Sequence, residues 1–183
     1  LYAIAPDGAV TTLGRQVGGP IDPNQRFSQG PNGLVVDKDG TVLVMRQALR
    51  DIGRLNKDGT FSSFLSRYEG KRFNAPNDMV FGPDGTLWFT DPAFSVPGYA
   101  YGQPQPPAKD LPYQGVFRYR NGKLDLVVTD MPTPNGIGLS PDGKTLFIST
   151  ASPGPRIKAY DIQRDGSVAN GRDFYVWPLA PGQ

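Results

Sequence analysis

The ten-residue stretch PNGLVVDKDG at residues 31–40 decides the fold, because it recurs twice further along the chain. Its copies are PNDMVFGPDG at 76–85 and PNGIGLSPDG at 134–143, and in each the asparagine stands seven residues before the aspartate of an Asp-Gly pair. The copies begin 45 and 58 residues apart. Repeats of this length are typical of propeller blades or solenoid coils, and the strand–turn–strand content of each copy favours blades.

Each repeat is the start of a four-stranded unit. Short β-branched and aromatic runs that are bounded by Asp-Gly or Asn-Gly indicate hairpins. The first hairpin of each unit turns at Asp39, Asp84 or Asp142, and a second one turns near residues 58–59, 121–122 or 165–166. Residues 1–13 resemble a second hairpin alone. We therefore expect an all-β chain, a single β-propeller domain over residues 1–183, with about three and a half four-stranded blades.

A propeller with this number of blades would have open faces. Three and a half blades leave a sheet edge and an apolar blade face uncovered, which favours association. The sequence therefore predicts a domain that is incomplete at both ends, either as a fragment or completed by a second chain. Aromatic residues of the strands are expected between blades, namely Trp88, Phe89, Phe117 and Tyr119.

Two long stretches fall outside the strand pattern, residues 14–30 and 91–114. Long connections of this kind often serve as lids or binding loops, and a packed surface loop is the equal alternative. Asp91, at the start of the second stretch, is interpreted as a turn anchor rather than a catalytic residue.

Composition excludes several kinds of function. The chain has 183 residues with no His and no Cys, so disulfides, thiolate chemistry and histidine-based catalysis are excluded. The net charge of +2 arises from 19 basic and 17 acidic residues spread along the chain, which predicts no nucleic-acid partner. No apolar stretch approaches the roughly 20 residues of a membrane span. These features are compatible with a bacterial cytoplasmic or periplasmic location.

The three asparagines of the repeat are the strongest functional indication. Equivalent positions in propeller blades converge on one axis, so Asn32, Asn77 and Asn135 are candidates to face one shared cavity. The alternative is structural, because Asn and Asp cap backbone groups in turns and Asn-Gly is a common turn pair. For Asn32 the turn cap is the favoured interpretation.

The stretch from Tyr68 to Pro92, which reads YEGKRFNAPNDMVFGPDGTLWFTDP, resembles the gluconolactonase/regucalcin family, and so do PNGIGLSPDGKTLFIS at 134–149 and DGSVANGR at 165–172. The resemblance covers essentially the whole chain and is greatest to bacterial gluconolactonases. It implies a six-bladed propeller that binds a divalent cation in the central channel, usually Ca²⁺, with Zn²⁺, Mg²⁺ or Mn²⁺ as alternatives. Many members hydrolyse sugar lactones, and some relatives hydrolyse phosphoesters.

The resemblance also assigns roles to individual residues. Asn77 and Asn135 match the two asparagine ligands of the metal, and Asp78 matches an acid beside it, the candidate catalytic residue. The Glu and Asp ligands of the family fall outside this chain. Regucalcins carry an arginine two residues before the first asparagine, where this chain has Ala75, so the substrate contacts of that arginine are not carried over. Arg72, further back, and Asn32 are the candidates for substrate binding, although the resemblance assigns Asn32 no clear role.

The chemistry of these residues is consistent with hydrolysis. Neutral amide oxygens suit a hard cation alongside carboxylates, but two amides alone do not offset its charge. Side chains alternate along a strand, so Asn77 and Asp78 should not both point at one ion, and Asp78 would orient water or support the ligands.

We expect a metal-dependent hydrolase that opens a sugar lactone, as in gluconolactonases, or a similar ester. A phosphotriesterase-like hydrolase and a non-catalytic binding propeller are the alternatives.

Overall fold

The computed structural model describes residues 1–15, 17–20, 23, 30–96, 110–150 and 154–178. Strands and turns make up this part of the chain, and in it no helix is long and apolar enough to cross a membrane. Most of the stretches 14–30 and 91–114 that sequence analysis weighed as lids lies outside the described residues. The described start of the second stretch is buried, from Asp91 to Val96.

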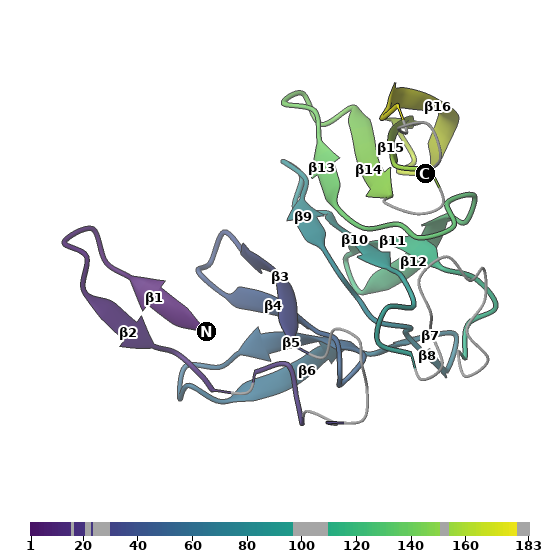
Figure 1. Cartoon of the computed structure of the whole chain (residues 1–183). Coiled ribbons are helices and arrows are strands. Elements are labelled where there is room, and N and C mark those ends of the chain that lie inside the picture. The colour runs from purple at the N-terminus through teal and green to yellow at the C-terminus, as the bar shows by residue number, and fades with distance from the viewer. Residues whose placement is uncertain (16, 21–22, 24–29, 97–109, 151–153, 179–183) are drawn as a thin grey trace.

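Three antiparallel sheets of four strands form successive blades (Figure 1). The first blade contains β3 (Pro31–Val36), β4 (Val42–Arg46), β5 (Asp51–Leu55) and β6 (Phe61–Leu65). The second contains β9 (Met79–Phe81), β10 (Leu87–Asp91), β11 (Gly115–Arg120) and β12 (Lys123–Val128). The third contains β13 (Ile137–Leu139), β14 (Thr145–Thr150), β15 (Arg156–Ile162) and β16 (Val168–Val176). This is the β-propeller arrangement that the repeat predicts.

The first strand of each blade is the inner one. Strand β9 lies between β3 and β13, and all three face the interior of the arc that the blades form (Figure 1). The asparagine of each repeat lies at or just before the start of such a strand. The repeats therefore bring their asparagine ends together.

Two smaller hairpins complete the described strands. The hairpin of β1 (Tyr2–Ile4) and β2 (Val10–Thr12) is the predicted half blade, and all six of its residues are exposed. Strands β7 (Arg67–Tyr68) and β8 (Lys71–Arg72) form a short hairpin that the repeat does not predict. Its turn places Glu69 and Gly70 at positive φ, 49° and 78°.

The turns between the first two strands of each blade form as predicted. The carboxylates of Asp39, Asp84 and Asp142 accept backbone N–H groups two residues ahead at 2.8, 3.0 and 3.1 Å. The glycines that follow have φ of 83°, 81° and 67°, a conformation that residues other than glycine rarely adopt.

The core fills the spaces between blades, as the aromatic pattern predicted. Phe89 and Phe117 are fully buried and their rings stack at 5.2 Å between the first and second blades, where Tyr119 also packs. Trp88 lies on the other face of the second blade, in a cluster with Leu146 and Ile148 of the third. Burial of apolar surface on both faces of the second blade therefore fixes the positions of its neighbours.

Candidate functional site

The three asparagine-led segments are joined to one another by hydrogen bonds. The Gly33 N–H donates to the carbonyl oxygen of Asn77 at 2.8 Å, which links the first repeat to the second. The Thr90 hydroxyl donates to the carbonyl oxygen of Asn135 at 2.6 Å, which links the second blade to the third repeat. The backbone at the candidate ligands is therefore held in a continuous network.

Asp78 lies between two glycines of the neighbouring repeats. A Cβ atom at Gly33 would come within 2.8 Å of its Oδ1, and a Cβ atom at Gly136 would come within 3.8 Å of its Oδ2. The two carboxylate oxygens accept the N–H groups of Met79 at 2.9 Å and Ile137 at 3.2 Å. Asp78 thus bridges the second and third blades, and the glycine at Gly33 is required for close approach of the strands.

This geometry gives Gly33 and Gly136 a different role from that of turn residues. Neither has a positive φ, and Asn32 lies inside strand β3. The segment of Asn32 is therefore extended backbone that packs against the next repeat rather than an Asn-Gly turn, and a capping role of the Asn32 side chain stays a prediction. The Asn-Gly pair in the sequence could not show whether this segment forms a turn or a closely packed strand, because glycine suits both.

Thr90 is the residue at this site that sequence analysis missed. It is fully buried at the end of β10, and its hydroxyl oxygen accepts the Asp78 N–H at 3.2 Å while its proton is donated to Asn135. Its backbone pairs with the same segment, donating to Asp78 and accepting from Asn77. One side chain therefore sets the spacing of the two candidate metal ligands. Its only sequence signal is a polar residue at the end of an otherwise apolar strand.

The side-chain amides of the three asparagines have no hydrogen-bond partner among the residues that the structure describes. Asn77 is 5% exposed, Asn135 is half-buried and Asn32 is exposed. Their amides make no hydrogen bond to a described residue, although the backbone N–H groups of Asn77 and Asn135 are bonded at 2.9 and 2.8 Å. Buried polar groups are normally satisfied, so an unpartnered amide at a fixed position indicates a ligand or water.

The segment before Asn77 is fixed by a buried carboxylate. Asp91 has no exposed surface and accepts the N–H groups of Asn74 at 2.8 Å and Ala75 at 2.9 Å. This agrees with its predicted role as an anchor. Arg50 adds a second support, since its Nε donates to the carbonyls of Phe73 at 2.6 Å and Asn74 at 3.0 Å. Burial lowers the pKa of Arg50, and the Asp110 carboxylate opposes that shift.

Arg72, the candidate for substrate binding, lies in β8. Its guanidinium donates to the carbonyl of Leu49 at 3.1 Å, and its backbone N–H donates to Asp110 at 3.3 Å. No hydrogen bond joins it to the asparagine-led segments among the described residues. The half-buried guanidinium has further donors, so its assignment to substrate stays a prediction.

The donor set at the inner strands is oxygen only. Among the described residues, no three His, Cys, Asp or Glu side chains come together as a metal cluster. The amide oxygens of Asn77 and Asn135 suit Ca²⁺, which accepts neutral oxygen ligands, but they bring no charge. Both oxygens of Asp78 are already engaged with backbone N–H groups. These residues fit part of a cation site that would need further carboxylates.

The fold and the repeat define a β-propeller of four-stranded blades. The sequence model described as SMP-30/Gluconolactonase/LRE-like region matches residues 20–182, and the chain belongs to this family.

Among curated proteins, the chain is 33% identical to a gluconolactonase from Zymomonas mobilis over 166 residues, which is 88% of this chain and 46% of that protein. It is 28% identical to a lactonohydrolase from Aspergillus oryzae over 134 residues, 68% of this chain and 29% of that protein. A solved gluconolactonase structure from Xanthomonas campestris superposes with a TM-score of 0.76 at 30% identity, covering 94% of this chain and 54% of that one. The chain spans about half the length of the gluconolactonases it matches.

Proposed function

We propose that this chain supplies two amide ligands, from Asn77 and Asn135, to the divalent-cation site of a lactone hydrolase. The observation that carries the proposal is a pair of amides, with no partner in the described part of the chain, on a backbone that hydrogen bonds hold in place. Membership of the gluconolactonase family supports the reaction class. Ca²⁺ is the proposed ion, because all the donors in reach are oxygens.

The ion, when bound, would polarise the lactone carbonyl and stabilise the oxyanion that forms on attack by water. The chain's own residues would hold this arrangement in place. The side-chain amides of Asn77 and Asn135 would bind the ion. Thr90 sets the spacing of these two residues, and Asp78 links the second blade to the third by a hydrogen bond. Other carboxylates, in the pattern of the family, would balance the charge.

Asp78 has a supporting role in this proposal rather than that of a metal ligand. Its oxygens accept two backbone N–H groups, and each still has a lone pair for a water molecule. A carboxylate at this position can take a proton from an attacking water. Arg72 and Asn32 are the proposed contacts to the hydroxyl groups of the substrate.

The experiment is a substrate assay on the whole protein with and without Ca²⁺. We expect hydrolysis of D-glucono-lactone that is lost after chelation and restored by Ca²⁺. Hydrolysis of a phosphotriester in preference to lactones would instead support the phosphotriesterase-like alternative. Binding of Ca²⁺ without turnover of either substrate would support a binding propeller. Turnover that chelation leaves unchanged would contradict the proposal.

A further inference from the structure

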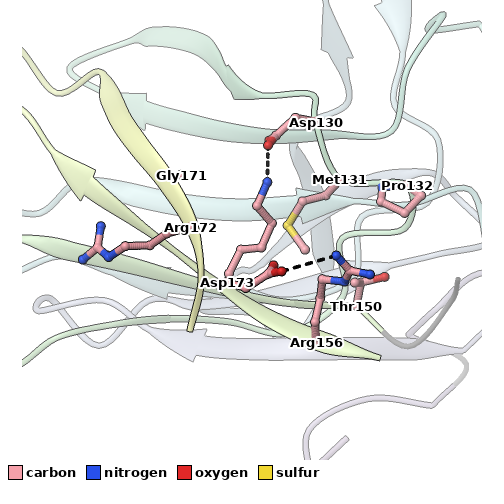
Figure 2. A pocket seen from close by; sticks show the side chains of 9 residues that line it. Asp130, Met131, Pro132, Thr150, Arg156, Gly171, Arg172 and Asp173 are labelled. Carbon is pink, nitrogen blue, oxygen red and sulfur yellow. Dashed lines mark hydrogen bonds and ion pairs between the residues drawn. The ribbon is translucent and has the colours of Figure 1, made fainter. Parts of the chain in front are cut away.

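A polar cavity of about 410 Å³ lies between the third blade and the connection that leads into it from the second blade. One wall is this connection from β12 to β13, at Asp130, Met131 and Pro132, and the other is formed mainly by β15 and β16 of the third blade (Figure 2). The charged groups of the cavity lie on β15, on β16 and at Asp130, none of which belongs to the asparagine-led segments.

Strand alternation decides which side chains enter the cavity. Arg156 and Lys158 are two residues apart on β15, so they face the same side of the sheet, and Asp173 of β16 pairs with Lys158. The adjacent Arg172 faces the other side, where it bonds to Asp161 at 2.8 Å. Figure 2 shows the Arg172 guanidinium turned away from the cluster of the other four charged groups.

The cavity contains two basic and two acidic side chains, and its two ion pairs differ in how closely the partners are bonded. Lys158 forms an ion pair with Asp130, and the Tyr160 hydroxyl donates to the same carboxylate at 2.7 Å. Among the described residues, Arg156 has a 3.5 Å contact to Asp173 and a bond to the carbonyl of Gly154 at 3.2 Å. Its side chain is 38% exposed. Arg156 is thus a guanidinium with donors to spare, beside carboxylates that can accept more hydrogen bonds.

We propose that this cavity binds a small carboxylate that carries several hydroxyl groups. The ligand carboxylate would pair with Arg156, whose planar fork suits bidentate contact. Its hydroxyl groups would donate hydrogen bonds to the carboxylates of Asp130 and Asp173. A simple anion has no such donors, and these carboxylates would repel it. A bare metal ion does not fit, because each carboxylate is already paired with a cation. A polyanion does not fit, because the charges cancel.

The size of the ligand follows from the cavity. A volume of about 410 Å³ lies within the range of small-molecule sites, which begins at about 300 Å³. Met131 lines it between the charged groups and gives it an apolar contact, and Thr150, whose hydroxyl is paired with that of Thr133 at 2.7 Å, lines it as well. A six-carbon hydroxy acid fits this space and this pattern of groups.

The test is calorimetric titration of the whole protein with sodium gluconate, sorbitol and sodium hexanoate. Gluconate has both the carboxylate and the hydroxyl groups, whereas each of the other two has one kind alone. We expect gluconate to bind at least about tenfold more tightly than either, and Arg156→Ala to weaken it at least about tenfold, as expected for loss of a charge-assisted hydrogen bond. Arg156→Lys, which keeps the charge, should fall between.

Two controls separate this cavity from the inner-strand site. Arg172→Ala removes a neighbouring arginine that faces the other way and should leave gluconate binding unchanged. Asn77→Ala tests the other site, because gluconate is the product expected at the proposed lactonase site, and the effects of Arg156→Ala and Asn77→Ala therefore show at which of the two sites gluconate binds, so this inference can fail or hold independently of the proposed function. Equal binding of the three compounds would overturn it. So would loss of gluconate binding in Asn77→Ala but not in Arg156→Ala, or an equal loss in Arg156→Ala and Arg172→Ala.

Discussion

At the Asp-Gly end of each repeat the polar side chain is paired with backbone, whereas at the asparagine end the side-chain amide has no partner among the described residues. Asp39, Asp84 and Asp142 all accept the same N–H two residues ahead. Asn77 and Asn135 have bonded backbones, but their amides have no partner in the part of the chain that the structure describes. The two ends lie seven residues apart in the same repeat, yet only the Asp-Gly end has its side chain paired with described residues.

This difference separates residues that fold the blade from residues that are available to a ligand. A side chain that satisfies a turn stabilises the chain by itself, typically by about 1 kcal/mol for a cap. A buried amide that satisfies nothing is destabilising unless water or a ligand completes it. Substitutions at the Asp-Gly end of a repeat should therefore mainly lower stability. Substitutions at the asparagine end should mainly lower ligand binding and activity.

The largest effect is expected from removal of the unpartnered amides. Asn77→Ala or Asn135→Ala in the whole protein should lower kcat/KM for a lactone by more than about 100-fold, beyond the range for residues that only support ligands. Cation affinity, measured by calorimetry, should fall in parallel. Asn32→Ala, at the same repeat position but exposed, should have a far smaller effect. Equal losses at all three positions would indicate a structural role for each.

A matched pair of buried threonines sharpens the comparison. Thr90 bonds to Asn135, while Thr86, four residues earlier, bonds to Asp84 at 2.9 Å in the turn. Thr90→Val should cost about 1–3 kcal/mol of unfolding free energy by leaving the Asn135 carbonyl without this donor. Thr86→Val should cost less, because the Asp84 side chain is 46% exposed to water and also pairs with Arg120. Only Thr90→Val should also lower cation affinity, by about tenfold. Equal affinities in the two variants would show that Thr90 does not position the ligands.

Close approach of the inner strands can be tested by adding a single methyl group. Gly33→Ala would place Cβ 2.8 Å from the Asn77 carbonyl oxygen, so we expect a loss of about 1–3 kcal/mol, the usual range for overpacking. Gly138→Ala is the control, because nothing lies within 4 Å of its Cβ position. Chemical denaturation of both variants measures the difference. Similar stabilities would mean that β3 and β9 are not packed as described.

The smallest effects belong to the turn carboxylates and concern pH. Hydrogen bonds from Thr41, Ser140 and Ser167 lower the pKa of Asp39, Asp142 and Asp165, respectively. Since these pKa values are lower in the folded state, the stability they contribute is present above the usual aspartate pKa of about 3.9 and is lost as pH falls through the folded values. Denaturation at pH 7, 5, 4 and 3 should show a decline below about pH 4. Asp39→Asn should reduce that decline, and an unchanged decline in this variant would contradict the assignment.

Much of the blade architecture could be predicted from the sequence, because the same strand–turn–strand pattern occurs three times. The strands, the Asp-Gly turns and the aromatic residues between blades follow from local patterns. Less of the site could be predicted, because its contacts run between repeats. The roles of Gly33 and Thr90 depend on how closely β3, β9 and β13 approach one another. The β7–β8 hairpin lies outside the repeat, so the repeat gave no indication of it.

The most direct test is a crystal structure of the whole protein grown with Ca²⁺. The account predicts one ion with the side-chain oxygens of both Asn77 and Asn135 at about 2.3–2.6 Å, the usual distance for Ca²⁺–oxygen bonds. Asp78 should keep its bond to the Ile137 N–H. An ion bound elsewhere, or amides of Asn77 and Asn135 that point to different faces and cannot share a ligand, would contradict the account.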